Sequence, residues 1–458
     1  MRISVSGLYS YRHSLTEYIK VSFAKVFADG TFFVSTKYFR TIRQQNISAV
    51  FFVMRADILS ASYIKKQGGQ PPKMKGEMFM QKCMDDYHTN FETYEDMFSY
   101  HKDQSAHSRW DRRKVKDLTV APLDSASTLV TRISDFGAGV SKEAVEDTVQ
   151  NLGLAIKVDK KYYPVRDTAY KSLLDRAKIG GTALPKLERK ELAKVLNACL
   201  KLYSADALLL FRDEKVTAVH SGDQTDYSVL PVEELLETLQ EKLDERFPEN
   251  EFETGYCDHS MVSASWRMPK QKEELLEAYT ELLEKSGKKA LAGKLMPGVR
   301  FMTSDTGTSS AKVSALLVGG QHPIHIGSCI SVEHRHQKKI GDFEKALDGL
   351  FAKFGDSVAK LQKLLTVDLD YPVNTMTRLC KKLSMPKKAA VEAIKMFEMA
   401  NGNNPATAHD VFMAMQEIPY ILRTQKTSQS KLLSVEENLA RALSVRWSEY
   451  DLAKGVDY

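Results

Sequence analysis

Four of the eleven histidines lie close together, in the stretch HPIHIGSCISVEHRHQ that runs from His322 to Gln337. Imidazole binds zinc and manganese, and a nearby carboxylate often completes such a site. Residues two apart on a strand point to the same face, so His334 and His336 form a natural pair that a neighbouring strand can complete. The candidate ligands for a divalent metal are therefore Asp305, His322, His325, His334 and His336.

The same stretch carries positive charge that opposes a metal ion. Arg335, Lys338 and Lys339 flank the histidines and would repel a divalent cation. They extend a positive edge, and we predict that these three cations contact nucleic acid. The alternative interpretation is a solvated basic strand end whose histidines make ordinary hydrogen bonds. This interpretation needs no cofactor, and a divalent metal stays open as the alternative.

A second candidate site is the turn in TSDTGTSSAK, which begins at Thr303. Turns rich in Ser, Thr, Asp and Gly present backbone N–H groups, and such groups suit phosphate oxygens. The polar residues of this turn are Asp305, Ser309 and Ser310, and the cations Arg300 and Lys312 border it. The alternative is an ordinary hairpin turn.

The third candidate is HSRWDRRKVK, residues 107–116. A basic run with an aromatic ring is typical of proteins that hold single-stranded nucleic acid, because the charges follow the backbone and the ring stacks on a base. The alternatives are a solvated charged linker and a tryptophan that packs into the core. The residues predicted to contact nucleic acid here are Arg109, Trp110, Arg112, Arg113, Lys114 and Lys116.

Common catalytic motifs are missing or incomplete. DFGAG at Asp135 resembles the magnesium-binding turn of kinases, but no H-R-D loop accompanies it. GKKALAGKL at Gly287 has the wrong spacing for a phosphate-binding loop and lacks its Ser or Thr. The signatures G-x-S-x-G, H-E-x-x-H and G-x-G-x-x-G do not occur. The sequence therefore favours a protein without catalysis over an enzyme.

Composition points to an ordinary globular protein with a mild basic excess. The net charge is +6 over 458 residues, and the first 120 residues hold 19 Lys and Arg against 12 Asp and Glu. Negatively charged partners are therefore favoured. The five cysteines show no C-x-x-C spacing, which indicates a reducing cytoplasm, and we expect neither a leader peptide nor a membrane segment.

Hydrophobic patterns predict an α+β protein in which antiparallel hairpins alternate with helices. Asp29-Gly30 suggests a hairpin in a basic N-terminal region, 1–118, and QGGQPPKMKG at 67–76 suggests a linker. An α+β core, 119–340, contains the hairpin ALLLFRDEKVTAVHSG and the helix PVEELLETLQEKLDERF. Amphipathic patterns from 341 to 458 predict a helical subdomain.

Three segments of the core resemble a known family. They are AYKSLLDRAKI, LLLFRDEKVTAVHSGDQTDYSVLPVEELLETL and VRFMTSDTGTSSAKVSALLVGG. In these segments the chain is similar to the phage/plasmid-like protein family known as domain of unknown function 932, although it has GSCISVEH where members often carry Cys-x-Asn-Gly. The resemblance implies a mobile-element protein acting in replication, recombination or conflict with a host, and it supplies no catalytic residues.

Three functional hypotheses follow from these observations. The first is a mobile-element protein that binds nucleic acid without catalysis, with single-stranded DNA as the expected ligand and homo-oligomers as the expected assembly. The second is a metal-dependent nuclease or hydrolase at the histidine cluster. The third is a protein-interaction factor that acts against a host system through the helical subdomain, where Leu439, Leu443 and Trp447 have helical spacing.

Overall fold

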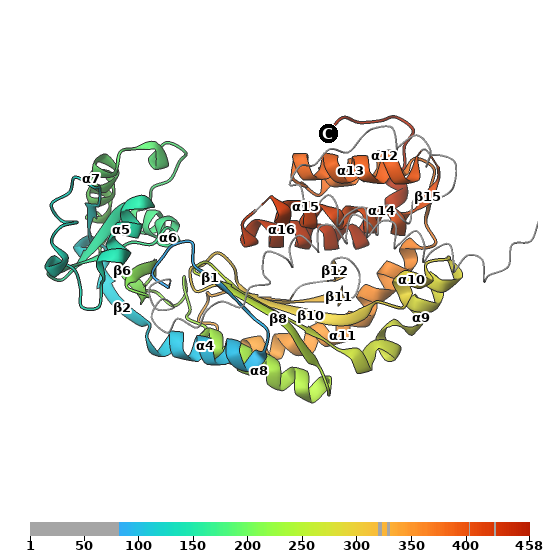
Figure 1. Ribbon diagram of the computed structural model, residues 1–458, viewed down its shortest axis with the longest axis horizontal. Coiled ribbons are helices and arrows are strands. Elements are labelled where there is room, and N and C mark those ends of the chain that lie inside the picture. Colours follow the sequence, from blue (N-terminus) through green and yellow to red (C-terminus); the bar gives the residue numbers. More distant parts are fainter. Residues whose placement is uncertain (1–81, 319–322, 328–329, 403, 426) are drawn as a thin grey trace, which may run out of the picture. The chain divides into compact units, whose positions relative to one another are not determined.

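The computed structural model describes residues 82–458, except 319–322, 328–329, 403 and 426, and it confirms the α+β class (Figure 1). The chain divides into two units, Met1–Lys73 and Met74–Tyr458, and the described residues all belong to the second. The hairpin predicted at Asp29-Gly30 and the linker predicted at 67–76 lie outside the described residues. None of the described helices is long and apolar enough to span a bilayer.

The largest sheet among the described residues has seven strands, which are all antiparallel to their neighbours. The order is β1-β8-β9-β10-β11-β12, with β13 also paired to β11. The strands are β1 (His88–Phe91), β8 (Glu251–Asp258), β9 (Val262–Arg267), β10 (Met296–Thr303), β11 (Ala311–Val318), β12 (Ile324–His325) and β13 (Ile330–Val332). Strands β10 and β11 thus form an antiparallel hairpin, and two short strands, β12 and β13, pair with the other edge of β11.

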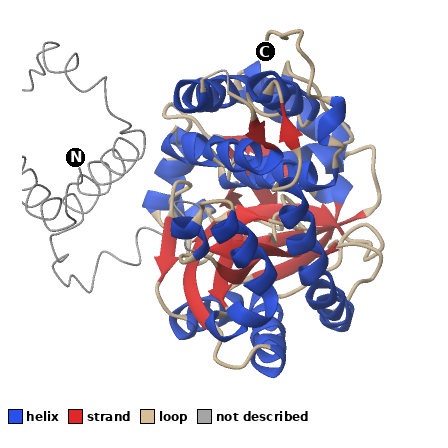
Figure 2. Ribbon diagram, turned by 90° about the vertical axis from the view of Figure 1, so that its right-hand side faces the viewer, coloured by secondary structure: helices blue, strands red, loops and turns tan. Residues whose placement is uncertain are grey.

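Helices cover this sheet on both faces (Figure 2). One face packs against helices whose buried apolar side chains join the largest hydrophobic core, and the other receives α16 (Gln429–Arg441) of the C-terminal region. The first group consists of α4 (Tyr94–Ala106), α8 (Val232–Arg246), α9 (Lys272–Lys285), α10 (Lys289–Ala292) and α11 (Ile340–Leu364). Trp266 of β9 is fully buried in this core.

Two three-stranded sheets and two helices surround a second core, which we call the small core. One sheet has the order β2-β6-β7 and the other β3-β4-β5. Their strands are β2 (Arg109–Lys114), β6 (Asp206–Arg212), β7 (Lys215–Ser221), β3 (Thr119–Pro122), β4 (Leu154–Val158) and β5 (Lys161–Pro164). The helices are α6 (Ala169–Ala177) and α7 (Arg189–Leu200), while α5 (Lys142–Gln150) packs through Val145 in a separate, smaller cluster.

The hairpin predicted in ALLLFRDEKVTAVHSG is confirmed as β6 and β7. Asp213 and Glu214 form its turn and both have positive φ, 47° and 69°, as the two central residues of a tight hairpin turn require. The glutamate is held in this conformation because its carboxylate accepts hydrogen bonds from the backbone N–H and the hydroxyl of Ser141.

The C-terminal region is helical, as predicted, apart from one two-stranded ladder. It contains α12 (Pro372–Lys382), α13 (Lys387–Asn401), α14 (Ala408–Met415), α15 (Glu417–Thr424) and α16 (Gln429–Arg441), and the ladder joins β14 (Asp368–Leu369) to β15 (Ala406–Thr407). The proposed contact residues Leu439, Leu443 and Trp447 are buried in the main core. They therefore cover the core rather than present a surface.

Segments that we placed in the N-terminal region contribute to the seven-stranded sheet and to the β2-β6-β7 sheet. β1 pairs with β8, and β2 pairs with β6 along its whole length. Local sequence patterns identify neither pairing, because each partner lies far away in the chain.

Candidate nucleic-acid interface

Strand β2 carries the basic run around Trp110, and its two faces have different roles. Arg109 lies over the rings of Phe211, 4.3 Å from the ring centroid, and Tyr163. Arg113 pairs with Asp111 at 2.9 Å and with Asp159 at 3.1 Å. Because these contacts face the small core, this side of the strand serves mainly to fix β2.

The other face of β2 presents Trp110, Arg112 and Lys114. Asp206 lies 2.7 Å from the Lys114 ammonium and 4.0 Å from the Arg112 guanidinium. Arg112 is exposed, and its charge also lowers the pKa of Asp223, so a second carboxylate lies within electrostatic reach of this cation. Lys116, in the short turn after the strand, is exposed as well.

Trp110 is partly buried against the rings of His220 and Tyr227, and His334 lies against Tyr227. These four residues, Trp110, His220, Tyr227 and His334, are called the ring cluster. His220 and Tyr227 are stacked, with centroids 3.6 Å apart and planes within 7°. Trp110 and His334 lie 6.0 Å and 5.8 Å from the Tyr227 ring. The cluster therefore connects β2 to the segment after β13.

The loop 303–310 packs beneath the ring cluster. The backbone carbonyl of Asp305 accepts hydrogen bonds from His220 Nε2 at 2.7 Å and from the Tyr227 hydroxyl at 3.0 Å. Its carboxylate pairs with Arg212 at 2.7 Å, where the two side chains are 8% and 14% exposed. Asp305 is thus committed to holding the loop to the rings, and its charge is already balanced.

The hydroxyls of this loop are also used internally. Ser304, Thr306 and Thr308 all donate to the carbonyl of Ser260, and the Ser304 hydroxyl accepts from the backbone N–H groups of Thr306 and Thr308. Ser309 donates to the Ser310 carbonyl, and the Ser310 hydroxyl contacts Ser331. Since these groups already have partners, the turn offers fewer donors to phosphate than its sequence indicates.

Strand β13 ends at Val332, so the predicted strand carrying both His334 and His336 is wrong. His336 and Gln337 instead occupy the centre of a tight turn, 335–338, with φ of 58° at each residue. Non-glycine residues rarely adopt this conformation, which costs about 1–2 kcal/mol each.

Hydrogen bonds to a neighbouring loop hold the strained turn in place. The backbone N–H of His336 donates to the Thr225 carbonyl at 2.9 Å, and that of Gln337 donates to the Gln224 carbonyl at 3.1 Å. In consequence His334 is buried in the ring cluster, whereas Arg335 and His336 are exposed beside it. Lys338 pairs with Asp342, and Lys339 is exposed where α11 begins.

One cation of this neighbourhood was not predicted from the sequence. Arg176 lies in the last turn of α6, and its Nε is buried without a hydrogen-bond partner among the described residues. Burial lowers its pKa, and Asp175 and Asp226 act in the opposite direction. Its charge also lowers the pKa of His220, which places it next to the ring cluster. No sequence signal distinguishes it from other helical arginines.

Arg300 and Lys312 have a structural role, because each forms an ion pair with a residue outside the ring cluster. Arg300 pairs with Glu436 at 3.0 Å, and Lys312 pairs with Glu437. Both acids belong to α16. These two cations therefore bind the helix to the sheet, and their charges are not available to a phosphate.

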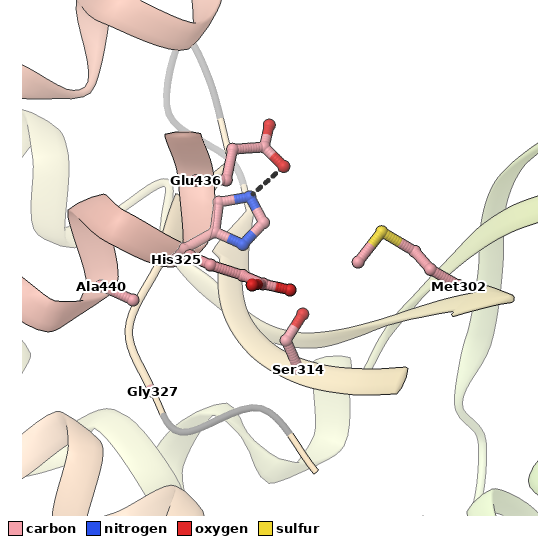
Figure 3. Close-up of a pocket in the computed structure, with 7 residues that line it drawn as sticks. Met302, Ser314, His325, Gly327, Glu436 and Ala440 are labelled. Atoms are coloured by element: carbon pink, nitrogen blue, oxygen red, sulfur yellow. Dashed lines mark ion pairs between the residues drawn. The ribbon is translucent and has the colours of Figure 1, made fainter. Parts of the chain in front are cut away.

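His325 takes part in the same contact, as Figure 3 shows. Its Nε2 lies 3.1 Å from the Glu436 carboxylate, which Arg423 also contacts. A cavity of about 20 Å³ lies beside them, with room for about one water molecule. The Ser314 hydroxyl points into it and is buried without a partner among the described residues.

The proposed metal ligands are thus separated by their contacts. His325 belongs to the α16 contact, His334 belongs to the ring cluster, Asp305 is hydrogen-bonded to that cluster through its carbonyl, and His336 is exposed. His322 lies outside the described residues. In the part of the chain that the structure describes, no group of three or more His, Cys, Asp or Glu side chains is arranged to hold a metal ion.

A second buried site surrounds Lys215, the first residue of β7, and local sequence patterns did not predict it. The Lys215 ammonium is fully buried, lies 2.9 Å from Asp85 and contacts Asp147. Arg166, 1% exposed, pairs with the same Asp85 at 3.2 Å and donates to the carbonyl of Met84. This charge network fixes the segment before β1 against the small core.

Five buried histidines predict a loss of stability in acid. Burial lowers the pKa of His101 to about 3 and of His220 and His409 to about 4, and it also lowers the pKa of His259 and His334. The unfolded chain, with His pKa near 6.5, therefore binds more protons as the pH falls. We expect the free energy of unfolding to decrease from about pH 6.5 downward, by up to about 1.4 kcal/mol per pH unit for each histidine.

Urea unfolding between neutral pH and pH 5 measures this slope. The test variant is His101→Phe. Both ring nitrogens of His101 are buried without hydrogen-bond partners among the described residues, and its neighbours include the rings of Phe91 and Tyr100, so a phenylalanine ring suits this position. This variant should have a shallower slope than the parent protein. An unchanged slope would show that His101 is not buried as a neutral side chain.

Comparisons with protein-family models, with curated proteins and with solved structures found no match to this chain. The resemblance to the phage/plasmid-like family therefore stays a prediction.

Proposed function

We propose that this protein binds nucleic acid without catalysing a reaction on it, with single-stranded DNA as its ligand. In line with the family resemblance, we propose a role in the replication or recombination of a mobile element, in the cytoplasm and as a homo-oligomer. One observation carries the proposal. The ring cluster joins the basic strand β2 to the basic turn 335–338, two segments that are far apart in the sequence.

The cations around the cluster form what we call the cationic rim, defined as Arg112, Arg176, Arg335 and Lys339. Arg112 shares a strand face with Trp110, Arg335 follows His334, and Arg176 acts electrostatically on His220. Arg335 makes no ion pair with a described residue. Cations beside an aromatic group suit single strands, because the charges attract phosphates while a ring can stack on a base.

The contacts also indicate which predicted residues contribute. Arg109, Arg113 and Lys114 are engaged with rings or carboxylates, and Arg300 and Lys312 bind α16. The proposed interface therefore rests on the cationic rim, with Lys116 and Lys338 as flanking charges.

The test is binding of labelled oligothymidylate to the double variant Arg112→Glu/Arg335→Glu, in salt from about 50 to 200 mM. We expect at least about a tenfold loss of affinity and a decrease of about 1.4 in the slope of log K against log salt, since each phosphate contact to a single strand contributes about 0.7. The two substitutions lie in the two different segments, so the variant tests whether both act on one ligand.

The matched control is Lys190→Glu/Lys201→Glu, which makes the same change in net charge. Both lysines are exposed, on α7 and at its end, and neither has an ion-pair partner among the described residues. Equal binding by the rim variant and the control would contradict the proposed interface. Absence of binding by the parent protein would contradict the function itself and would favour a protein partner.

A further inference from the structure

The helices α12 and α13 carry a concentration of positive charge that the proposed interface does not use. Six basic residues and two acidic ones occur between Pro372 and Asn401. The contrast with α8 is large, because that helix has six acidic and two basic residues. The basic residues are Arg378, Lys381, Lys382, Lys387, Lys388 and Lys395.

These cations are accessible and lack acidic partners. Lys381, Lys382, Lys387, Lys388 and Lys395 are exposed, and none of the six makes an ion pair with a described residue. Elsewhere exposed lysines often pair, as Lys194 does with Glu191 and Lys285 with Glu281. The charge of the α12–α13 surface, defined as these six basic residues, is therefore not neutralised by the fold.

The turn between the two helices is fixed, so the charges have a defined arrangement. The Met385 N–H donates to the Cys380 carbonyl, and Ser384 adopts a left-handed conformation with φ of 54°. The Tyr458 hydroxyl contacts the carbonyls of Cys380 and Met385. The C-terminal segment thus holds the turn closed while the lysines point outward.

Arg378 and Lys381 already bind the C-terminal segment, but only through its backbone. Arg378 donates to the Lys454 carbonyl and Lys381 to the Asp457 carbonyl. A neutral carbonyl leaves the charge of its donor in place.

Glu392 lies between Lys388 and Lys395 on the exposed face of α13, and it is the one carboxylate at helical spacing from both.

We infer that the α12–α13 surface is a second contact for the sugar-phosphate backbone of the same nucleic acid. The inference rests on the proposed function and extends it to a separate region of the chain. Lys388 and Lys395 lie about 10 Å apart along α13, which allows several phosphates to be contacted. The exposed residues of the two helices include no Phe or Trp, so this surface binds backbone and does not read bases.

The test compares three full-length proteins. They are the parent, the surface variant Lys382→Glu/Lys388→Glu/Lys395→Glu, and the control Lys186→Glu/Lys190→Glu/Lys201→Glu. The control lysines are exposed and lack ion-pair partners among the described residues, and both variants change the net charge equally. Each protein is titrated with oligothymidylates of increasing length across the salt series.

For the surface variant, we expect the slope of log K against log salt to become less steep by about 2, because about three phosphate contacts are removed. We also expect its affinity to fall at least about tenfold. The loss should be confined to long oligonucleotides, since a short one reaches only the rim. If the parent binds and the surface variant keeps both slope and affinity, the inference is overturned while the proposed function stands.

If the parent binds no nucleic acid, the proposed function and the inference both fail. Sedimentation of the three proteins at low salt then identifies the partner of the surface. Self-association of the parent and the control, lost in the surface variant, would assign the surface to an acidic protein face such as α8 of a second copy and would overturn the nucleic-acid inference.

Discussion

Replacement of Lys215 by methionine is expected to lower the free energy of unfolding by about 3–5 kcal/mol. Lys215 is fully buried between Asp85 and Asp147, which are 6% and 13% exposed. Arg166 still pairs with Asp85 after the substitution, but Asp147 keeps a largely buried charge without its cation. The cost arises from that uncompensated charge, because methionine fills the space of the lysine stem.

Urea denaturation followed by circular dichroism measures this loss. Lys194→Met is the matched control, since Lys194 pairs with Glu191 on the surface and should contribute less than about 1 kcal/mol. The double variant Lys215→Met/Asp147→Asn should recover part of the stability, because the unpaired charge is removed with its partner. A loss below about 1 kcal/mol for Lys215→Met would show that water reaches the site.

Replacement of Glu436 by glutamine should destabilise the protein by a similar amount, about 3–5 kcal/mol. Glu436 is 3% exposed and faces Arg300, Arg423 and His325. Although burial opposes ionisation, His325 and Arg300 hold the pKa of this carboxyl well below its usual range. Glutamine keeps the shape of the side chain but leaves the surrounding cations without a buried counter-charge.

The effect should be concentrated at α16, which this contact binds to β10 and β12. Hydrogen exchange should therefore become faster in α16 than in α8, and urea unfolding gives the global change. Glu437→Gln is the matched control because Glu437 is 30% exposed and should contribute less than about 1 kcal/mol. Equal exchange rates in parent and variant would mean that apolar packing alone holds α16.

The pKa of Glu436 also gives the pH range of this contribution. Because the folded-state pKa is depressed, the stabilisation is present above the unfolded value near 4.5 and is lost as the pH falls below it. The buried histidines act earlier, from about pH 6.5 downward.

Hydrophobic patterns predict helices and hairpins correctly where turn or capping residues in the sequence mark the ends of these elements. The β6–β7 hairpin and α8 were predicted because an acidic turn and an N-terminal proline mark their ends. By contrast α12 was not predicted as a separate helix, although Pro372 begins it. Its short polar and apolar runs have no strong boundary at the other end.

The candidate site was predicted less completely, since contacts between distant residues determine which cations remain available. Arg300 and Glu436 are 136 positions apart, and the pair removes a predicted phosphate ligand. The stacking of Tyr227 on His334 likewise joins two segments that are far apart in the sequence. Residue type identified the basic segments, but only the fold shows which charges are neutralised.

The short strand β1 determines which fragments of this chain can keep the large sheet protected. It covers the outer edge of β8, and the preceding residues are held by Arg166 and Lys215. A fragment that begins at residue 119 would expose a row of unpaired backbone N–H and C=O groups along β8, a ready template for aggregation. The residues just before β1 and the strand itself therefore protect the large sheet from self-association.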